Sequence, residues 1–146
     1  MNHITYVGVK TLCQIFSYTP YIEYIDLNQN NLTENGGVEL ANEIHHLIQL
    51  RGIGLKFNFL NYKGINALSY QLPLCSNLKM LNLTGNFIYS EEIDTLIWAI
   101  KSLKKLMYLN LSINQIASEG LAMLGSVLPE TIQHLNFSEN RISSEG

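Results

Sequence analysis

Apolar residues recur along the chain in five similar segments. Each segment has an aliphatic residue, a second apolar residue three places later and a third two places after that. The five sets are Ile22, Ile25 and Leu27; Leu50, Ile53 and Leu55; Leu78, Leu81 and Leu83; Leu106, Leu109 and Leu111; and Ile132, Leu135 and Phe137. The last two members of each set have the period of a strand with one face turned inward. Each segment therefore predicts a short strand.

The apolar spacing then changes to four residues, which places side chains on one face of a helix. The pairs are Leu12 and Phe16, Leu40 and Ile44, Leu68 and Leu72, Leu96 and Ile100, and Leu124 and Leu128. We expect helices of roughly ten to thirteen residues. Glycines at 8, 36, 64, 120 and 146 open these helices, where they allow close packing against a neighbour, and Glu92 replaces the glycine in one segment.

An asparagine ladder fixes the period of this pattern. Asparagine occupies the evenly spaced positions 2, 30, 58, 86 and 114, and a slightly shorter step leads to Asn140. Self-similarity at a fixed period of about 28 residues is typical of a solenoid. The short amide can satisfy backbone groups in the turn after each strand, so we interpret the ladder as structural.

Stacked strands lie about 4.8 Å apart, whereas helices are about 10 Å across. The array must therefore curve. We predict an α/β fold: a single solenoid domain over 1–146, a right-handed αβ horseshoe segment with a parallel sheet on the concave face and helices on the convex face. Repeats start near 22, 50, 78, 106 and 132, and a helix over 5–18 serves as the N-terminal cap. No helix follows the last strand, so we expect an exposed flank there that can make an end-to-end contact.

The pattern LxxLxLxxNxL, followed by a glycine and a helical Lxxx(L/I), resembles the ribonuclease-inhibitor-like class of leucine-rich repeats. The resemblance covers the chain from Asn2 to Gly146. It implies a leucine-rich repeat solenoid that binds proteins. Some members of this class inhibit enzymes by covering the active site, some act on small GTPases, and others sense ligands within larger receptors.

Composition narrows the classes of partner. Of 146 residues, 47% are hydrophobic and 14% charged, which indicates a folded domain. The net charge of -3 argues against nucleic acid as a partner, because nucleic-acid binders present a basic face. The local cluster of Lys101, Lys104 and Lys105 is interpreted as a solvated helix end. No stretch of 18 apolar residues exists, so no membrane span is expected.

The two cysteines, Cys13 and Cys75, lie in different repeats at core-facing positions, so we expect buried free thiols. Free thiols and the lack of a secretory signal in Met1 to Phe16 favour a cytoplasmic location. For a bacterial effector this would be the host cytoplasm. Four glycosylation sequons begin at Asn31, Asn82, Asn110 and Asn136, and three of them share one repeat position, so we interpret them as by-products of the repeat.

No catalytic, cofactor or metal site is predicted. His45 and His46 are adjacent, so their side chains diverge instead of sharing a ligand face. His134 stands on the predicted concave face without a suitable acidic partner. No nucleophile or phosphate-loop motif is present. We therefore predict that the chain is not an enzyme and needs no cofactor.

Residues between the core positions of each strand should face the concave side, and they vary from repeat to repeat. Exposed aromatic and methionine side chains flanked by amides have the composition of a protein interface. The candidate contact residues are Tyr24, Asp26, Lys56, Phe57, Met80, Asn82, Tyr108, Asn110, Ile113, His134 and Glu139. We expect Gly52, Gly54 and Gly85 to leave hollows for a protruding loop, and Phe59 and Phe87 to pack within the loop layer.

The predicted function is binding of another protein on the concave face. The sharper hypothesis is an inhibitor or antagonist that covers the active site of an enzyme. The alternatives are a GTPase-activating role, for which Arg51 and Arg141 are the available arginines, and an adaptor or recognition fragment of a larger receptor or bacterial effector.

Overall fold

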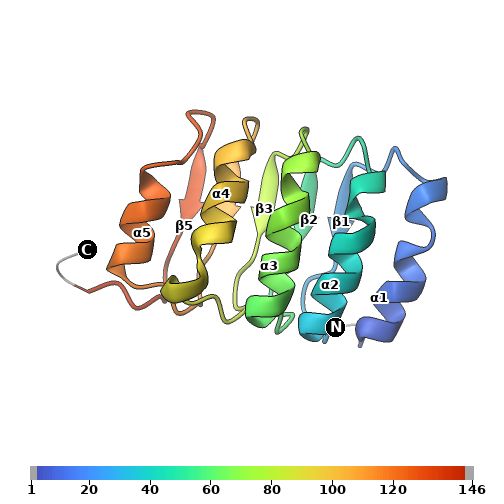
Figure 1. The fold of residues 1–146 in the computed structure, drawn as a ribbon, viewed down its shortest axis with the longest axis horizontal. Coiled ribbons are helices and arrows are strands. Elements are labelled where there is room, and N and C mark those ends of the chain that lie inside the picture. Colours follow the sequence, from blue (N-terminus) through green and yellow to red (C-terminus); the bar gives the residue numbers. More distant parts are fainter. Residues whose placement is uncertain (1–2, 144–146) are drawn as a thin grey trace.

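The computed structural model describes residues 3–143, and within them strands alternate with helices along one axis (Figure 1). Asn2 and Gly146, which belong to the predicted repeat pattern, lie outside the described residues. The α-helices are α1 (Tyr6–Cys13), α2 (Thr33–Glu43), α3 (Asn61–Gln71), α4 (Asp94–Ser102) and α5 (Ser118–Gly125). The strands are β1 (Tyr24–Asp26), β2 (Gly52–Gly54), β3 (Met80–Asn82), β4 (Tyr108–Asn110) and β5 (His134–Asn136). Short 3-10 helices are η1 (Phe16–Tyr18), η2 (Ile44–His46), η3 (Leu72–Leu74) and η4 (Ser90–Glu92).

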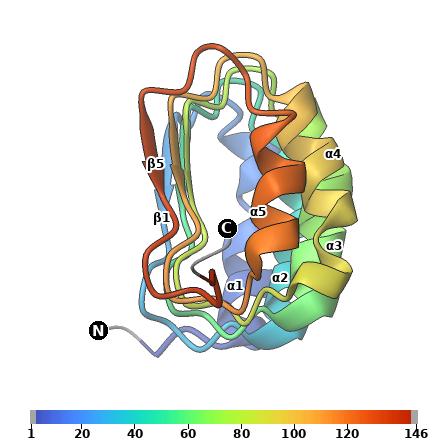
Figure 2. The ribbon, with the colours of Figure 1, turned by 90° about the vertical axis from the view of Figure 1, so that its left-hand side faces the viewer.

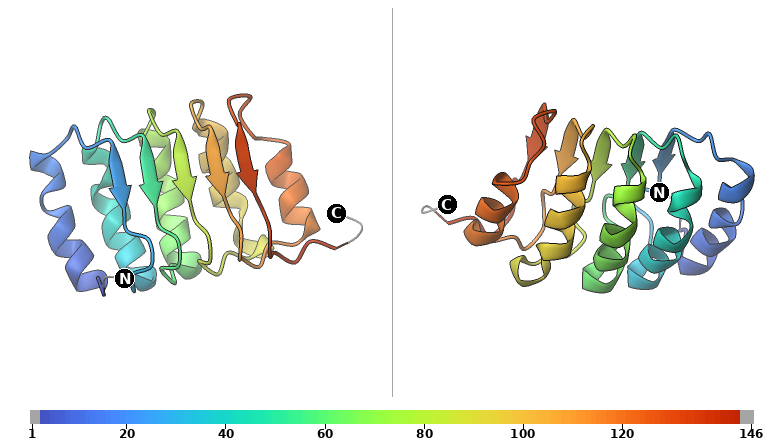
Figure 3. Two further views of the ribbon diagram at one scale, coloured as in Figure 1. Left: turned by 180° about the vertical axis from the view of Figure 1, so that it is seen from behind. Right: turned by 45° about the horizontal axis from the view of Figure 1, so that its top comes forward.

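The five strands form one parallel sheet in the order in which they occur in the sequence. Equivalent residues of successive repeats pair directly: Ile25 with Ile53, Ile53 with Leu81, Leu81 with Leu109, and Leu109 with Leu135. Figure 2 shows the strands on one side of the solenoid and the helices on the other. In the right-hand view of Figure 3 the row of helices is longer than the row of strands. The sheet therefore lies on the inner side of the curve, and the predicted α/β solenoid is confirmed.

The core lies between the two layers, at the positions that the apolar pattern predicts. The strand residues Ile53, Leu81 and Leu109 are fully buried, as are the helix residues Leu40, Ile44, Leu96 and Ile100. Aliphatic burial of this kind is the main favourable term in folding, at about 25 cal/mol per Å² of apolar surface. One continuous core connects all repeats.

The helices are shorter than expected. The α-helices have 8 to 11 residues, not roughly ten to thirteen, and 3-10 turns continue α2 and α3. The predicted helix over 5–18 is divided into α1 and η1. A 3-10 turn tightens the end of a helix and satisfies carbonyls that would otherwise lack donors. At the segment where Glu92 replaces glycine, η4 stands before α4, which has nine residues.

Glycine brings neighbouring helices close together. A Cβ atom built on Gly37 of α2 would lie 2.8 Å from Gly64 Cα of α3. A Cβ atom on Gly64 would lie 3.2 Å from the Glu34 carbonyl oxygen. The predicted packing glycines Gly36, Gly64 and Gly120 are buried, while Gly8 of α1, at the outer end of the helix row, is exposed.

The asparagine ladder joins each repeat to the one before it. Asn86 Nδ2 donates to the Leu55 carbonyl oxygen (2.9 Å), and Asn86 Oδ1 accepts from the Asn58 backbone N–H (3.2 Å). Asn114 repeats this geometry with Leu83 and Asn86. The structural role predicted for the ladder is confirmed. At Asn58 the pattern departs, because Oδ1 is buried without a partner among the described residues.

The last repeat is open on its outer flank. Leu135 of β5 is 42% exposed, although its counterparts in the four preceding strands are buried. No strand pairs with the far side of β5 within residues 3–143. The expected exposure of this flank is therefore present.

Candidate functional site

A strip of large side chains crosses the inner face of the sheet. It contains Tyr24 of β1, Met80 of β3, Tyr108 of β4 and His134 of β5. The ring of Tyr24 and the methyl of Met80 approach each other over Gly52, since a Cβ there would lie 2.6 Å from Tyr24 Cδ1 and 3.1 Å from Met80 Cε. The Tyr108 and His134 ring centroids are 6.1 Å apart. The strip thus extends over all five strands, and Tyr24 is 62% exposed.

The expectation of hollows at the three concave-face glycines is wrong for Gly52 and Gly54, whereas Gly85 lines the groove described below. Side chains of adjacent strands occupy the space: Tyr24 and Met80 over Gly52, Asn28 over Gly54, and Phe57 over Gly85. At Gly52 and Gly85 the physical reason is the regular stacking of the repeats, which places a long side chain of the equivalent position beside the glycine, whereas Asn28 reaches Gly54 from the turn after β1.

The concave-face residues two places after the strip positions serve the turns that follow the strands. Asp26 Oδ1 accepts the Asn28 N–H, Asn82 Oδ1 accepts the Thr84 N–H, and Asn110 Oδ1 accepts the Ser112 N–H. The Thr84 and Ser112 hydroxyls also donate to the same two asparagine oxygens, at 2.7 Å each. These side-chain oxygens satisfy backbone donors after the strand, so three of the predicted contact residues have a structural task inside the chain.

Gly54 cannot perform this task, and a neighbouring strand compensates. Asn28 Oδ1 crosses from the preceding repeat and accepts the Lys56 backbone N–H at 2.7 Å. Its amide then fills the space beside Gly54, where a Cβ would be 2.8 Å from Asn28 Nδ2. Asn28 therefore supplies the acceptor that Gly54 lacks, and the missing side chain of Gly54 provides the space for Asn28.

The turn position five residues after each strip position has left-handed backbone geometry in every repeat. Its members are Gln29 (φ 55°), Phe57 (φ 52°), Gly85 (φ 64°), Ile113 (φ 55°) and Glu139 (φ 56°). Glycine adopts this region readily, but for other residues it costs about 1–2 kcal/mol. A β-branched residue such as Ile113 is an outlier there. Ile113 is also 37% exposed, so burial within the chain does not fully offset that cost.

A groove follows these turn residues along the edge formed by the strand-to-helix loops. We call it the loop-edge groove; it encloses about 350 Å³ and is lined by Phe57, Phe59, Gly85, Phe87, Ile113, Asn114, Gln115 and Glu139. The Phe59 and Phe87 rings stack with centroids 5.9 Å apart. Both side chains are exposed, contrary to the expectation that they pack within the loop layer. Their recurrence directly after the ladder asparagine was the sequence feature that pointed to a shared position.

Charged side chains flank the groove. Lys56 Nζ lies 4.9 Å from the Phe57 ring centroid, and Glu139 lines the opposite end. The two arginines are engaged elsewhere. Arg51 forms an ion pair with Glu23 (3.3 Å), and the Arg141 guanidinium lies 5.9 Å from the Tyr89 ring centroid.

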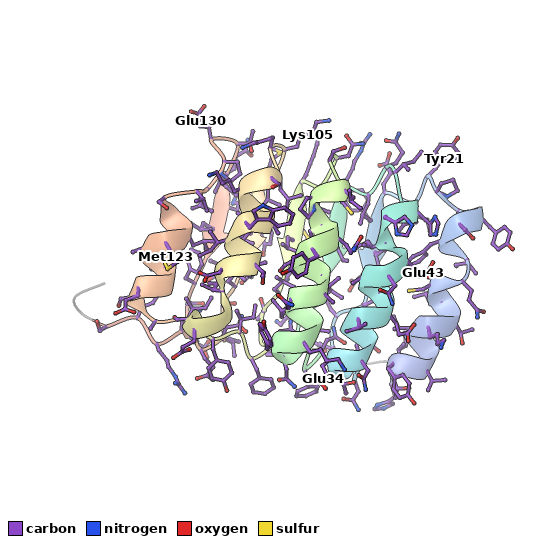
Figure 4. The ribbon with its side chains drawn as sticks, in the orientation of Figure 1. Tyr21, Glu34, Glu43, Lys105, Met123 and Glu130 are labelled. Carbon is purple, nitrogen blue, oxygen red and sulfur yellow. The ribbon has the colours of Figure 1, made fainter. Side chains whose placement is uncertain are left out.

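The helix side carries a different set of side chains. Glu43 of α2 and Met123 of α5 project from it, while Tyr21, Lys105 and Glu130 lie at the helix-to-strand loops (Figure 4). Tyr70 and Trp98 are exposed on neighbouring helices with ring centroids 6.3 Å apart. A hollow of about 430 Å³ beside Lys101 and Lys104 lies at the same loops as Glu130.

Among residues 3–143, no group of three or more histidine, cysteine, aspartate or glutamate side chains is placed to hold a metal ion. The adjacent His45 and His46 rings lie 4.1 Å apart, and His46 contacts Glu43. Cys13 and Cys75 are buried free thiols, as predicted. Burial, followed by the nearby carboxylates of Glu43 and Glu39, raises the pKa of Cys13 to about 12. Burial raises the pKa of Cys75 to about 11.

Within the described part of the chain, none of the helices has both the length and the apolar character needed to cross a bilayer.

Comparisons with known proteins also indicate leucine-rich repeats. A leucine-rich repeat family model matches residues 102–125 and 129–146. No curated protein matches the chain. An internalin from Listeria monocytogenes has 17% identity and a TM-score of 0.51, over 93% of this chain and 46% of the internalin.

Two further solved structures share the fold. A leucine-rich repeat protein from Leptospira interrogans has 23% identity and a TM-score of 0.54, over 88% of this chain and 34% of that protein. A chain of the TLR13–ssRNA13 complex has 18% identity and a TM-score of 0.51, over 86% of this chain and 20% of that one. This chain thus spans less than half the length of each solved relative. The repeat pattern, the solenoid and these similarities show that the chain has the fold of leucine-rich repeat proteins.

Proposed function

We propose that the chain binds a protein partner on the concave face of its sheet, and that it inhibits or antagonises an enzyme by covering the active site. The strip of Tyr24, Met80, Tyr108 and His134 is the observation that carries the proposal. Tyrosine and methionine are enriched in protein interfaces, and large aromatic anchors supply most of their binding energy.

The sheet supports this role because it is rigid and regular. Backbone pairing in register fixes the distance between successive members of the strip. Side chains that are ordered before binding lose less conformational freedom when the partner arrives. A continuous strip over five strands also offers the lateral extent needed to cover the mouth of an active site.

An adaptor or recognition role is the second candidate. Its support is the length of the solved relatives, of which this chain covers 46%, 34% and 20%. In that case the repeats would be the recognition part of a larger receptor or effector. GTPase activation has no comparable support, because Arg51 is paired with Glu23 and Arg141 packs on Tyr89.

The buried free thiols of Cys13 and Cys75 support a cytoplasmic site of action, which would be the host cytoplasm for a bacterial effector. The exposed flank at Leu135 supports an end-to-end contact in addition to the concave interface.

The test is an affinity capture with three forms of the protein: wild type, a Tyr24→Ala/Tyr108→Ala variant and a Tyr70→Ala/Trp98→Ala variant. The second pair is a matched control, since it removes two exposed aromatic side chains from the helix side. We expect the concave variant to bind the captured partner at least about tenfold more weakly, which corresponds to about 1.4 kcal/mol. The control should bind like wild type.

Equal binding by wild type and the concave variant would show that the concave face is not the interface. A titration of the captured enzyme then addresses inhibition. Its activity should fall in proportion to the bound fraction, and undiminished activity at saturation would remove the inhibitor role while leaving protein binding intact.

A further inference from the structure

We infer that the loop-edge groove binds an extended segment of the protein partner, with an apolar anchor residue placed between an acidic and a basic residue. The inference deepens the proposed function and rests on its premise that the chain binds a protein. It assigns a second contact region, at the strand-to-helix edge of the solenoid, with its own chemistry.

The walls of the groove come from two rows of loop residues that cross the repeats. Phe57, Gly85 and Ile113 form the row nearer the sheet, and Phe59 and Phe87 belong to the second row. The ring of Phe57 lies over Gly85, where any Cβ would be 2.1 Å from Phe57 Cδ1. Between the rows the groove is apolar, and its volume of about 350 Å³ is near the lower limit of small binding sites, which suits side chains of one short segment.

Backbone geometry gives an independent reason to assign a ligand. Phe57 and Ile113 occupy a left-handed turn position that holds glutamine, glycine or glutamate in the other repeats. The turn itself therefore requires neither an aromatic nor a β-branched side chain, and glycine would fit it without strain. Residues held at such a cost cluster at binding sites. Ile113 is still 37% exposed, so a partner that covers it would bury the rest of its apolar surface.

Opposite charges at the two ends of the groove determine the orientation in which the partner segment binds. Lys56 lies beside Phe57 at one end of the groove, and Glu139 lies at the other. Among residues 3–143, neither side chain forms an ion pair. A segment with an acidic residue near Lys56 and a basic residue near Glu139 complements both ends, and opposite charges at the rim select orientation.

The groove can be tested with a random peptide library displayed on phage and selected on the immobilised protein. We expect selected peptides to share an apolar residue flanked by one acidic and one basic residue. Affinity of the synthetic peptides is then measured by fluorescence anisotropy. The Ile113→Asn variant should bind them at least about tenfold more weakly, while its melting temperature equals or exceeds that of wild type, since asparagine tolerates the left-handed region better than isoleucine.

Gln29→Asn is the matched control, because Gln29 has the same turn geometry but lies outside the groove lining. It should leave peptide affinity unchanged. Selection on a Glu139→Lys variant should replace the basic residue of the consensus by an acidic one.

Three results would overturn the inference: no enrichment, equal affinity for Ile113→Asn and wild type, or a lower melting temperature of Ile113→Asn. Peptides that bind Ile113→Asn normally but lose affinity for Tyr24→Ala/Tyr108→Ala would place binding on the concave strip. That outcome ends the groove inference and leaves the proposed function standing.

Discussion

At the scale of single residues, the same repeat position can be served by side chains of different strands. Asn82 and Asn110 accept a backbone N–H two residues later in their own repeats. Where Gly54 replaces such a residue, Asn28 accepts the equivalent N–H of Lys56 from the neighbouring strand. The turn keeps its acceptor because in-register pairing brings an amide of one repeat next to the missing side chain of the next.

We predict that Asn28→Ala lowers the free energy of unfolding by about 1 kcal/mol, because the Lys56 N–H loses its acceptor. The Asn28→Ala/Gly54→Asn variant should recover most of that loss. The new asparagine has the space that Asn28 vacates and can accept the N–H within its own repeat, as Asn82 does. Urea denaturation of wild type and both variants measures the effect. A double variant less stable than the single one would contradict the exchange of roles.

At the scale of secondary-structure elements, the helices pack according to what glycine permits. Gly37 and Gly64 bring α2 and α3 into backbone contact, so that an added methyl group at Gly37 would meet Gly64 Cα at 2.8 Å. Gly125, the last residue of α5, has no atom within 4 Å of its hypothetical Cβ. Both glycines are helical, but Gly37 contacts the backbone of the neighbouring helix, whereas Gly125 faces open space.

We predict opposite effects of alanine at these two glycines. Gly37→Ala should destabilise the protein by about 1–3 kcal/mol, because the clash with a backbone atom outweighs the gain in helix propensity. Gly125→Ala should stabilise it by up to about 1 kcal/mol, because only the propensity changes. Thermal unfolding followed by circular dichroism compares them. A rise in melting temperature for Gly37→Ala would disprove the close contact of α2 with α3.

At the scale of the whole molecule, stability depends on the position of a repeat within the array. In a solenoid each repeat contacts only its neighbours. Leu81 and Leu135 are equivalent strand residues, but Leu81 has strands on both sides and is fully buried, whereas Leu135 is 42% exposed on the terminal strand. The same repeat position therefore contributes differently to the free energy of unfolding in central and terminal repeats.

We predict that Leu81→Ala lowers the free energy of unfolding by about 2–5 kcal/mol, the usual range for a buried leucine. Leu135→Ala should cost only about 1 kcal/mol, because a large part of this side chain is already exposed to solvent. Chemical denaturation of wild type and both variants measures the two losses in the free energy of unfolding. Similar costs at the two positions would show that the flank of β5 is covered in solution, as an end-to-end contact would require.

The repeating residues were sufficient to predict the scaffold. The fixed period of the repeat, the change of apolar spacing from two to four and the ladder asparagines define strand, turn and helix, because each depends on local geometry and on contact with an identical neighbour. The parallel register, the core positions and the buried thiols followed from that pattern.

The candidate site depended on more than the pattern. The sequence identified which strand residues vary, but it placed hollows at Gly52 and Gly54 that neighbouring side chains fill. It also assigned Phe59 and Phe87 to the loop layer, although they are exposed beside the groove. Both errors concern side chains of adjacent repeats that meet at the surface, whose rotamers no local rule determines.

The amino-acid sequence by itself thus determined the architecture of this protein: a parallel sheet, a row of helices and one core between them. Only the tertiary structure decided how the variable side chains share space, which of them satisfy turns and which remain exposed along the strip and the loop-edge groove. The physical reason is that periodic burial repeats in every unit and is encoded locally, whereas surface shape arises where unlike residues of adjacent repeats meet.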